Sequence, residues 1–171
     1  MFPLRPLPVY ATDTPLAGLR TAELFVVCSL RLWVSGWQDR NAAPPAWHKG
    51  FAVAGMADDG EAAFGELLRV VATTAVRRLD VRCRQCAHLG EDEGWLLQLL
   101  SLLQRDRIAE AASILSHWLP PSAVRIATGP AQLFAAELTA CGLKIPVRHA
   151  AAAVVQRSAS PAHACASTLV H

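Results

Sequence analysis

Residues 91–103, with the sequence EDEGWLLQLLSLL, decide the fold of this chain. Three carboxylates come first, and negative side chains in the first turn of a helix are stabilised by the helix dipole. The rest of the stretch is apolar except at Gln98 and Ser101, which share one helix edge with Arg105. A helix that is apolar over most of its circumference must be covered by neighbours. The stretch therefore predicts a central, buried helix.

The segments on both sides carry the three- and four-residue apolar spacing of amphipathic helices. Alanine and leucine supply much of the apolar content, and both favour helix over strand. Asp106 is predicted to cap the next helix, Pro120-Pro121 to end it, and Gly129-Pro130 to open the last one. We therefore expect an all-α fold, a compact bundle of five or six helices with short loops. The expected helices, besides the central one, span residues 14–37, 45–55, 58–79, 106–118 and 129–141.

The patterning divides the chain into three parts. Residues 1–13 contain several prolines, and we expect an irregular N-terminal arm there. Residues 14–146 hold the amphipathic segments and form the predicted helical domain. Residues 147–171 are rich in alanine, serine and valine without periodicity, so we expect a flexible, disordered C-terminal tail.

Charge and hydropathy argue against two broad classes of function. The net charge is +2, which is too close to neutral for the basic surface of nucleic-acid-binding domains. The most apolar window, residues 16–37, contains Arg20, Glu23 and Arg31, each of which is costly at the middle of a bilayer. We therefore expect neither a nucleic-acid partner nor a membrane span.

Five cysteines occur at positions 28, 83, 86, 141 and 165, and no secretory signal precedes them. This combination favours a reducing, cytoplasmic location, where cysteines are buried, metal-bound or redox-active rather than joined in structural disulfides. The stretch from Cys83 to His88, CRQCAH, gathers two thiols and an imidazole within six positions. It is the candidate site of the chain.

Cys83, Cys86 and His88 are candidate zinc ligands. A Cys-x-x-Cys turn can direct two thiolates at one metal ion, and the histidine can supply a third ligand. A tetrahedral site needs a fourth ligand from elsewhere, and the chain has no second Cys-x-x-Cys or His-x-x-x-His pair. A zinc-binding or metal-sensing domain is therefore one hypothesis, and a protein without any cofactor is the other.

The same two thiols also fit a redox switch or a structural role. Arg78, Arg82 and Arg84 surround them, and nearby positive charge raises the thiolate fraction of a cysteine. Cysteine also packs in cores as a small apolar residue. The charges around the motif suit the ends of the two predicted helices that flank it. Metal ligand, redox pair and structural residue all remain open from the sequence.

No catalytic constellation accompanies the cysteines. The chain lacks a phosphate-binding glycine loop, a dinucleotide fingerprint and a His-Glu-x-x-His motif. Trp47 and Trp95 lie near the ends of predicted helices, where a tryptophan can be partly exposed and bind a partner. Packing in the core or at its boundary is the other interpretation of both residues, and it is the one that burial tendencies favour. We therefore expect a non-enzymatic regulatory or adaptor protein that acts through protein–protein contacts or self-association.

Overall fold

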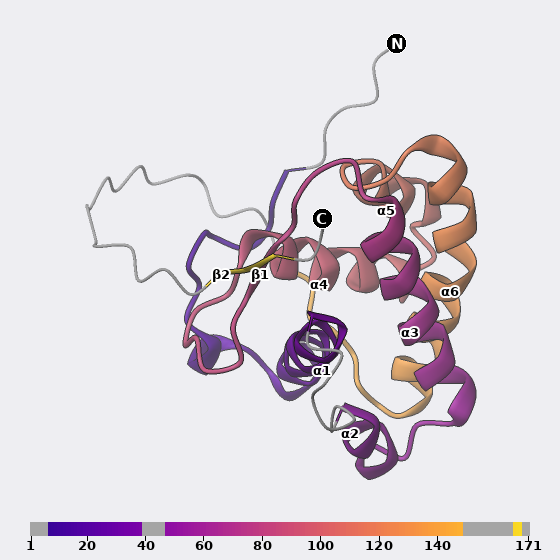
Figure 1. Ribbon diagram of the computed structural model, residues 1–171. Helices are drawn as coiled ribbons and strands as arrows, with labels where there is room; N and C mark the ends of the chain where they lie inside the picture. Colours follow the sequence, from indigo (N-terminus) through magenta and orange to yellow (C-terminus); the bar gives the residue numbers. More distant parts are fainter. Residues whose placement is uncertain (1–6, 39–46, 149–165, 169–171) are drawn as a thin grey trace.

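The computed structural model describes residues 7–38, 47–148 and 166–168. These residues form an all-α fold, as predicted, with one short pair of strands (Figure 1). The elements in chain order are the 3-10 helix η1 (Leu16–Gly18), α1 (Thr21–Gln38), α2 (Trp47–Val53), α3 (Asp58–Thr74), β1 (Asp80–Arg82), α4 (Glu91–Leu103), α5 (Ile108–Leu115), α6 (Pro121–Ala140) and β2 (Ala166–Thr168).

Helix α4 is the central element, as its sequence predicts. It contacts α1, α5, α6 and β1, and most of its side chains are buried. Helices α3 and α6 run alongside each other and share the most extensive contact between described helices (Figure 1). Phe64 of α3 meets Phe134 of α6 with ring centroids 4.9 Å apart, and Phe51 of α2 packs on Phe64 at 5.3 Å. These aromatic rings join three helices into one core.

Helix α6 corrects the prediction of a break at Gly129-Pro130. It runs without interruption from Pro121 to Ala140, with Pro130 inside it. Proline removes one backbone hydrogen bond and crowds the Cβ of the residue before it. Gly129 has no Cβ, so the crowding is relieved, and the helix fully buries Phe134. Tertiary packing therefore outweighs the local cost of the proline.

Several helix ends also differ from the sequence prediction. Helix α3 begins at Asp58, as predicted, but its N-cap residue Ala57 makes no side-chain cap bond. Asp106 has a φ of 57° in the turn after α4, and α5 begins at Ile108. Aspartate tolerates this left-handed conformation better than most residues do. Helix α1 begins at Thr21, because the segment before it forms the separate helix η1.

The two strands join parts of the chain that are far apart in sequence. Strand β1 pairs antiparallel with β2, with Asp80 opposite Thr168 and Arg82 opposite Ala166. Strand β1 follows α3, which ends earlier than predicted. Strand β2 falls within the predicted tail, of which residues 149–165 and 169–171 lie outside the described residues, as do residues 1–6 of the predicted arm.

Candidate functional site

The predicted cysteine pair lies in the loop between β1 and α4, and the structure brings the two side chains together. The sulfur atoms of Cys83 and Cys86 are 2.7 Å apart, and either thiol can be the donor. The N–H of Cys86 donates to the carbonyl of Cys83 at 3.1 Å, which closes a tight turn. Both cysteines are half-buried, whereas Arg84 and Gln85 between them are exposed. The pair therefore lies at the surface of the fold.

Arg31 of α1 holds this loop from the interior. Its Nη1 donates to the carbonyl of Cys86 at 2.6 Å, and its Nη2 to the carbonyl of His88 at 2.8 Å. Its Nε and Nη2 also donate to the two carboxylate oxygens of Glu93 at 2.7 and 2.8 Å. The side chains of Arg31 and Glu93 are only 2% and 0% exposed. A buried ion pair with bidentate geometry thus fixes the backbone of the loop.

The charge of Arg31 is set by its surroundings. Burial by itself lowers the pKa of Arg31, but the hydrogen bond and the charge of Glu93 outweigh it, and the pKa lies above its ordinary value. Cys86 and Cys28 add smaller contributions in the same direction. Arg31 therefore stays protonated and carries a fixed positive charge beside the backbone of Cys86.

Glu93 ties the two ends of the loop together. Its carboxylate accepts hydrogen bonds from the N–H of Arg82 at 3.1 Å and from the N–H of Gly90 at 2.7 Å. Arg82 is the last residue of β1, and Gly90 is the last residue of the loop before α4. A Cβ at Gly90 would lie 2.6 Å from the carbonyl oxygen of Asp80, so the close approach of the two ends requires glycine here.

The first residue of η1 and the segment before η1 provide a third attachment. The N–H of Leu16 donates to the carbonyl of Ala87, and the N–H of Leu89 donates to the carbonyl of Thr14, both at 2.8 Å. Together with the bonds from Arg31, these contacts engage three successive carbonyls that begin at Cys86. The half of the loop that carries Cys86 is therefore held firmly in place.

The predicted zinc ligands are brought together only in part. Cys83 and Cys86 are adjacent, but within the described ranges no group of three or more His, Cys, Asp or Glu side chains is arranged to hold a metal ion. The side chain of His88 is exposed, and it is the backbone carbonyl of this residue that Arg31 binds. The zinc hypothesis stays a prediction.

Trp47 and Trp95 are buried, which agrees with the packing interpretation and not with the partial exposure on which a partner-binding role depends. Their exposed fractions are 7% and 4%. Trp47 packs edge-on against Phe51 with ring centroids 5.4 Å apart. Trp37, by contrast, is 38% exposed at the end of α1, where it stacks on Trp33. Apolar contact inside the bundle thus accounts for both predicted residues.

Asp92 is a buried polar residue that the sequence suggested only as a helix-dipole partner. It accepts hydrogen bonds from Nη1 and Nη2 of Arg77 at 2.9 and 2.5 Å, and from Nε1 of Trp118 at 2.8 Å. It also accepts one from the N–H of Asp80 at 2.6 Å, which fixes the start of β1. The hydrogen bond to Asp92 raises the pKa of Arg77 despite its partial burial.

A third buried carboxylate, Glu23 of α1, joins the N-terminal arm to the segment after α6. It accepts hydrogen bonds from the hydroxyl of Tyr10 at 2.7 Å and from Nε and Nη2 of Arg148 at 2.7 and 2.9 Å. Burial by itself raises the pKa of Glu23, but the bonds from Arg148, the N–H of Arg20 and Tyr10 outweigh it and lower the pKa. The pKa of Tyr10 is raised, mainly by burial and in second place by its hydrogen bond to Glu23.

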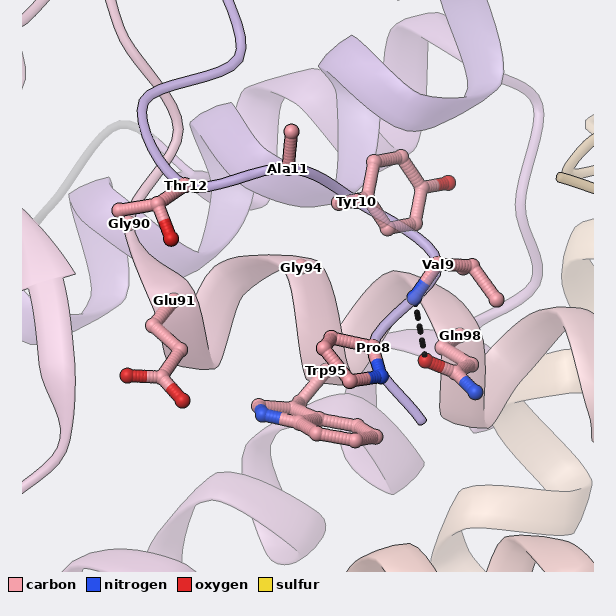
Figure 2. Close-up of a pocket in the computed structure, with 10 residues that line it drawn as sticks. All are labelled: Pro8, Val9, Tyr10, Ala11, Thr12, Gly90, Glu91, Gly94, Trp95 and Gln98. Carbon is pink, nitrogen blue, oxygen red and sulfur yellow. Dashed lines mark hydrogen bonds between the residues drawn. The ribbon is translucent and has the colours of Figure 1, made fainter. Parts of the chain in front are cut away.

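The arm itself crosses α4, as Figure 2 shows. The N–H of Val9 donates to Oε1 of Gln98 at 3.3 Å, the contact drawn as a dashed line. A hollow of about 50 Å³ lies between the arm and α4, with Trp95 among its lining residues. A Cβ at Gly94 would lie 3.2 Å from the Cβ of Tyr10. The small residue on α4 therefore allows the arm to lie close to the helix.

No model of a known protein family matches this chain, and neither does any curated protein or solved structure. Within the described part of the chain, none of the helices combines the length and the hydropathy that crossing a membrane requires. A functional assignment therefore depends on the chemistry of the chain's own residues.

Proposed function

We propose that this protein is a regulatory protein, not an enzyme, and that its Cys83–Cys86 pair cycles between a dithiol and a disulfide. The observation that carries the proposal is the 2.7 Å separation of the two sulfur atoms. A disulfide bond is about 2.05 Å long, so closing this one requires only a small movement of the two side chains. Of the hypotheses that the sequence left open, the redox pair is the one that this geometry favours.

The surroundings of the pair support reversible chemistry. Arg31, Glu93 and the segment before η1 hold the backbone on the Cys86 side, so oxidation and reduction need not disturb the helices. The exposed residues Arg84 and Gln85 lie between the two sulfurs. Closing the bond therefore alters, over a short range, a surface that a protein partner or a second copy can contact.

The oxidant in this proposal is a small-molecule disulfide. One thiolate of the pair attacks it and forms a mixed disulfide, which releases one small thiol. The second thiolate then attacks the mixed disulfide at the protein sulfur, forms the Cys83–Cys86 bond and releases the second small thiol. Two electrons pass from the protein to the small disulfide, and the two protons of the cysteines end on the released thiols.

The test is oxidation of the full-length protein with glutathione disulfide, followed by alkylation and peptide mass spectrometry. The expected product is a peptide with a Cys83–Cys86 bond, together with a change in oligomer size by light scattering. Cys83→Ser is expected to stop the reaction at a mixed disulfide on Cys86. Cys141→Ser is the matched control, because this half-buried cysteine ends α6 away from the loop and its loss should leave the bond intact.

Two results would refute the proposal. One is the absence of both the bond and the size change after prolonged incubation with excess glutathione disulfide. The other is a product in which Cys83 or Cys86 is joined to Cys165 rather than to its neighbour. Elemental analysis of the reduced protein, purified without a histidine tag, tests the zinc hypothesis separately. Stoichiometric zinc that is lost in Cys86→Ser would favour a metal site over the redox pair.

A further inference from the structure

A groove of about 260 Å³ lies in a part of the fold that does not include the cysteine loop. It is bounded by the N-terminal arm, the second half of α4, the beginning of α5 and the segment after α6. Three arginines line it, namely Arg105, Arg107 and Arg148, and Glu110 is the acidic residue among its lining residues. The groove therefore carries an excess of positive charge.

The three arginines differ in how their charge is balanced. Arg148 forms an ion pair with the buried Glu23, and Arg107 forms a bidentate pair with Glu110. Arg105 donates instead to neutral oxygens: to the backbone carbonyl and the hydroxyl of Ser101, and to the carbonyl of Ile145. Among the described residues, Arg105 is thus the cation of the groove whose hydrogen bonds include none to a carboxylate.

The same hydrogen bonds fix the orientation of Arg105. A guanidinium has five N–H donors, and the contacts to Ser101 and Ile145 use three of them. Two donors remain for a ligand, which matches the two oxygens of a carboxylate. Because the side chain is already held in place, a ligand would not have to order it on binding.

The apolar residues that line the groove indicate the second feature of the ligand. Leu7 and Val147 line it and are 72% and 54% exposed, and Leu102 forms part of its floor. Exposed aliphatic side chains beside a fixed cation suit a molecule with an acidic end and an apolar body. We infer that this groove binds a small carboxylate with a short aliphatic chain, its carboxylate on Arg105 and its chain against Leu7 and Val147.

Octanoate is the probe, and its binding to the full-length reduced protein is measured by isothermal titration calorimetry. Arg105→Gln should weaken binding about tenfold or more, because a hydrogen bond to a charged group contributes about 1.5–3 kcal/mol. Arg69→Gln is the matched control, since Arg69 is an exposed arginine of α3 that does not line the groove. It should bind octanoate as the unaltered protein does.

Leu7→Asp is a second variant, because Leu7 is largely exposed and its replacement should leave the fold intact. A carboxylate at this position repels the ligand and should also weaken octanoate binding about tenfold. Octanol has the aliphatic chain without the carboxylate, and inorganic phosphate is an anion without the chain. Each should therefore bind more weakly than octanoate. The inference is overturned if octanoate does not bind, if octanol or phosphate binds equally well, or if Arg105→Gln and Leu7→Asp leave binding unchanged.

Discussion

Glu93→Gln should be one of the most destabilising single changes in this protein. The two carboxylate oxygens of Glu93 accept four hydrogen bonds, two from Arg31 and one each from the N–H groups of Arg82 and Gly90. Glutamine has nearly the same shape, but one of its two terminal groups is an amide donor. In either orientation the amide faces two donors, and the guanidinium of Arg31 is left without an anion.

The size of the effect follows from the burial of the pair. The side chains of Arg31 and Glu93 are 2% and 0% exposed, and removing one partner of a buried pair costs about 3–5 kcal/mol. A domain is stable by about 5–15 kcal/mol in total, so the loss is a large part of that. With a urea slope of about 2 kcal/mol per M, the unfolding midpoint should fall by about 2 M.

Urea unfolding followed by tryptophan fluorescence measures this shift, and Glu66→Gln is the matched control. Glu66 forms an ion pair with Arg69 on the surface of α3, where both side chains are about half exposed. An exposed pair of this kind contributes about 0.5 kcal/mol or less. The reasoning is refuted if both variants lower the midpoint by the same small amount with an unchanged urea slope.

Three further predictions concern close packing and pH. Gly90→Ala should lower the free energy of unfolding by about 1–3 kcal/mol, because the new Cβ meets the Asp80 carbonyl at 2.6 Å. In the control Gly18→Ala the new Cβ has nothing within 4 Å, so the melting temperature, which falls in Gly90→Ala, should not fall. The pKa of Glu23 is lowered in the folded state, so its contribution to stability is full above about pH 4.3 and is lost as the pH falls through the lower folded value. Glu23→Gln should remove that part of the acid dependence in urea unfolding. The pKa of Tyr10 is raised, so its contribution is full below about pH 10 and declines above it, and Tyr10→Phe should flatten this alkaline loss.

The helices were predictable because their signal is local. Apolar residues three and four positions apart define one face of α1, α3 and α5, and the nearly continuous apolar run of α4 indicates its central position. The break predicted in α6 was wrong because it relied on Gly129-Pro130 alone. Local propensity cannot show that Phe134 and its neighbours pack against α3.

The cysteine pair was predictable from the spacing of Cys83 and Cys86, but its supports were not. Arg31 stands out in the sequence only as a charge inside an apolar window, and in the structure it is 3% exposed. Its partner Glu93 is 62 residues further along the chain. A charged residue inside an apolar window is a signal of such a pair. The identity of the partner depends on how the helices cross, and no spacing rule contains that information.

The three buried carboxylates explain how the irregular parts of this fold are ordered. Glu93 closes the cysteine loop, Asp92 fixes the start of β1, and Glu23 binds the N-terminal arm. These segments lack a periodic apolar face, so burial of apolar area alone cannot specify their positions. Hydrogen bonds to a buried charge are directional and costly to leave unmade. A carboxylate on a firmly packed helix can therefore hold a loop that has little hydrophobic surface. In the cysteine loop, this support keeps the two sulfur atoms close to each other.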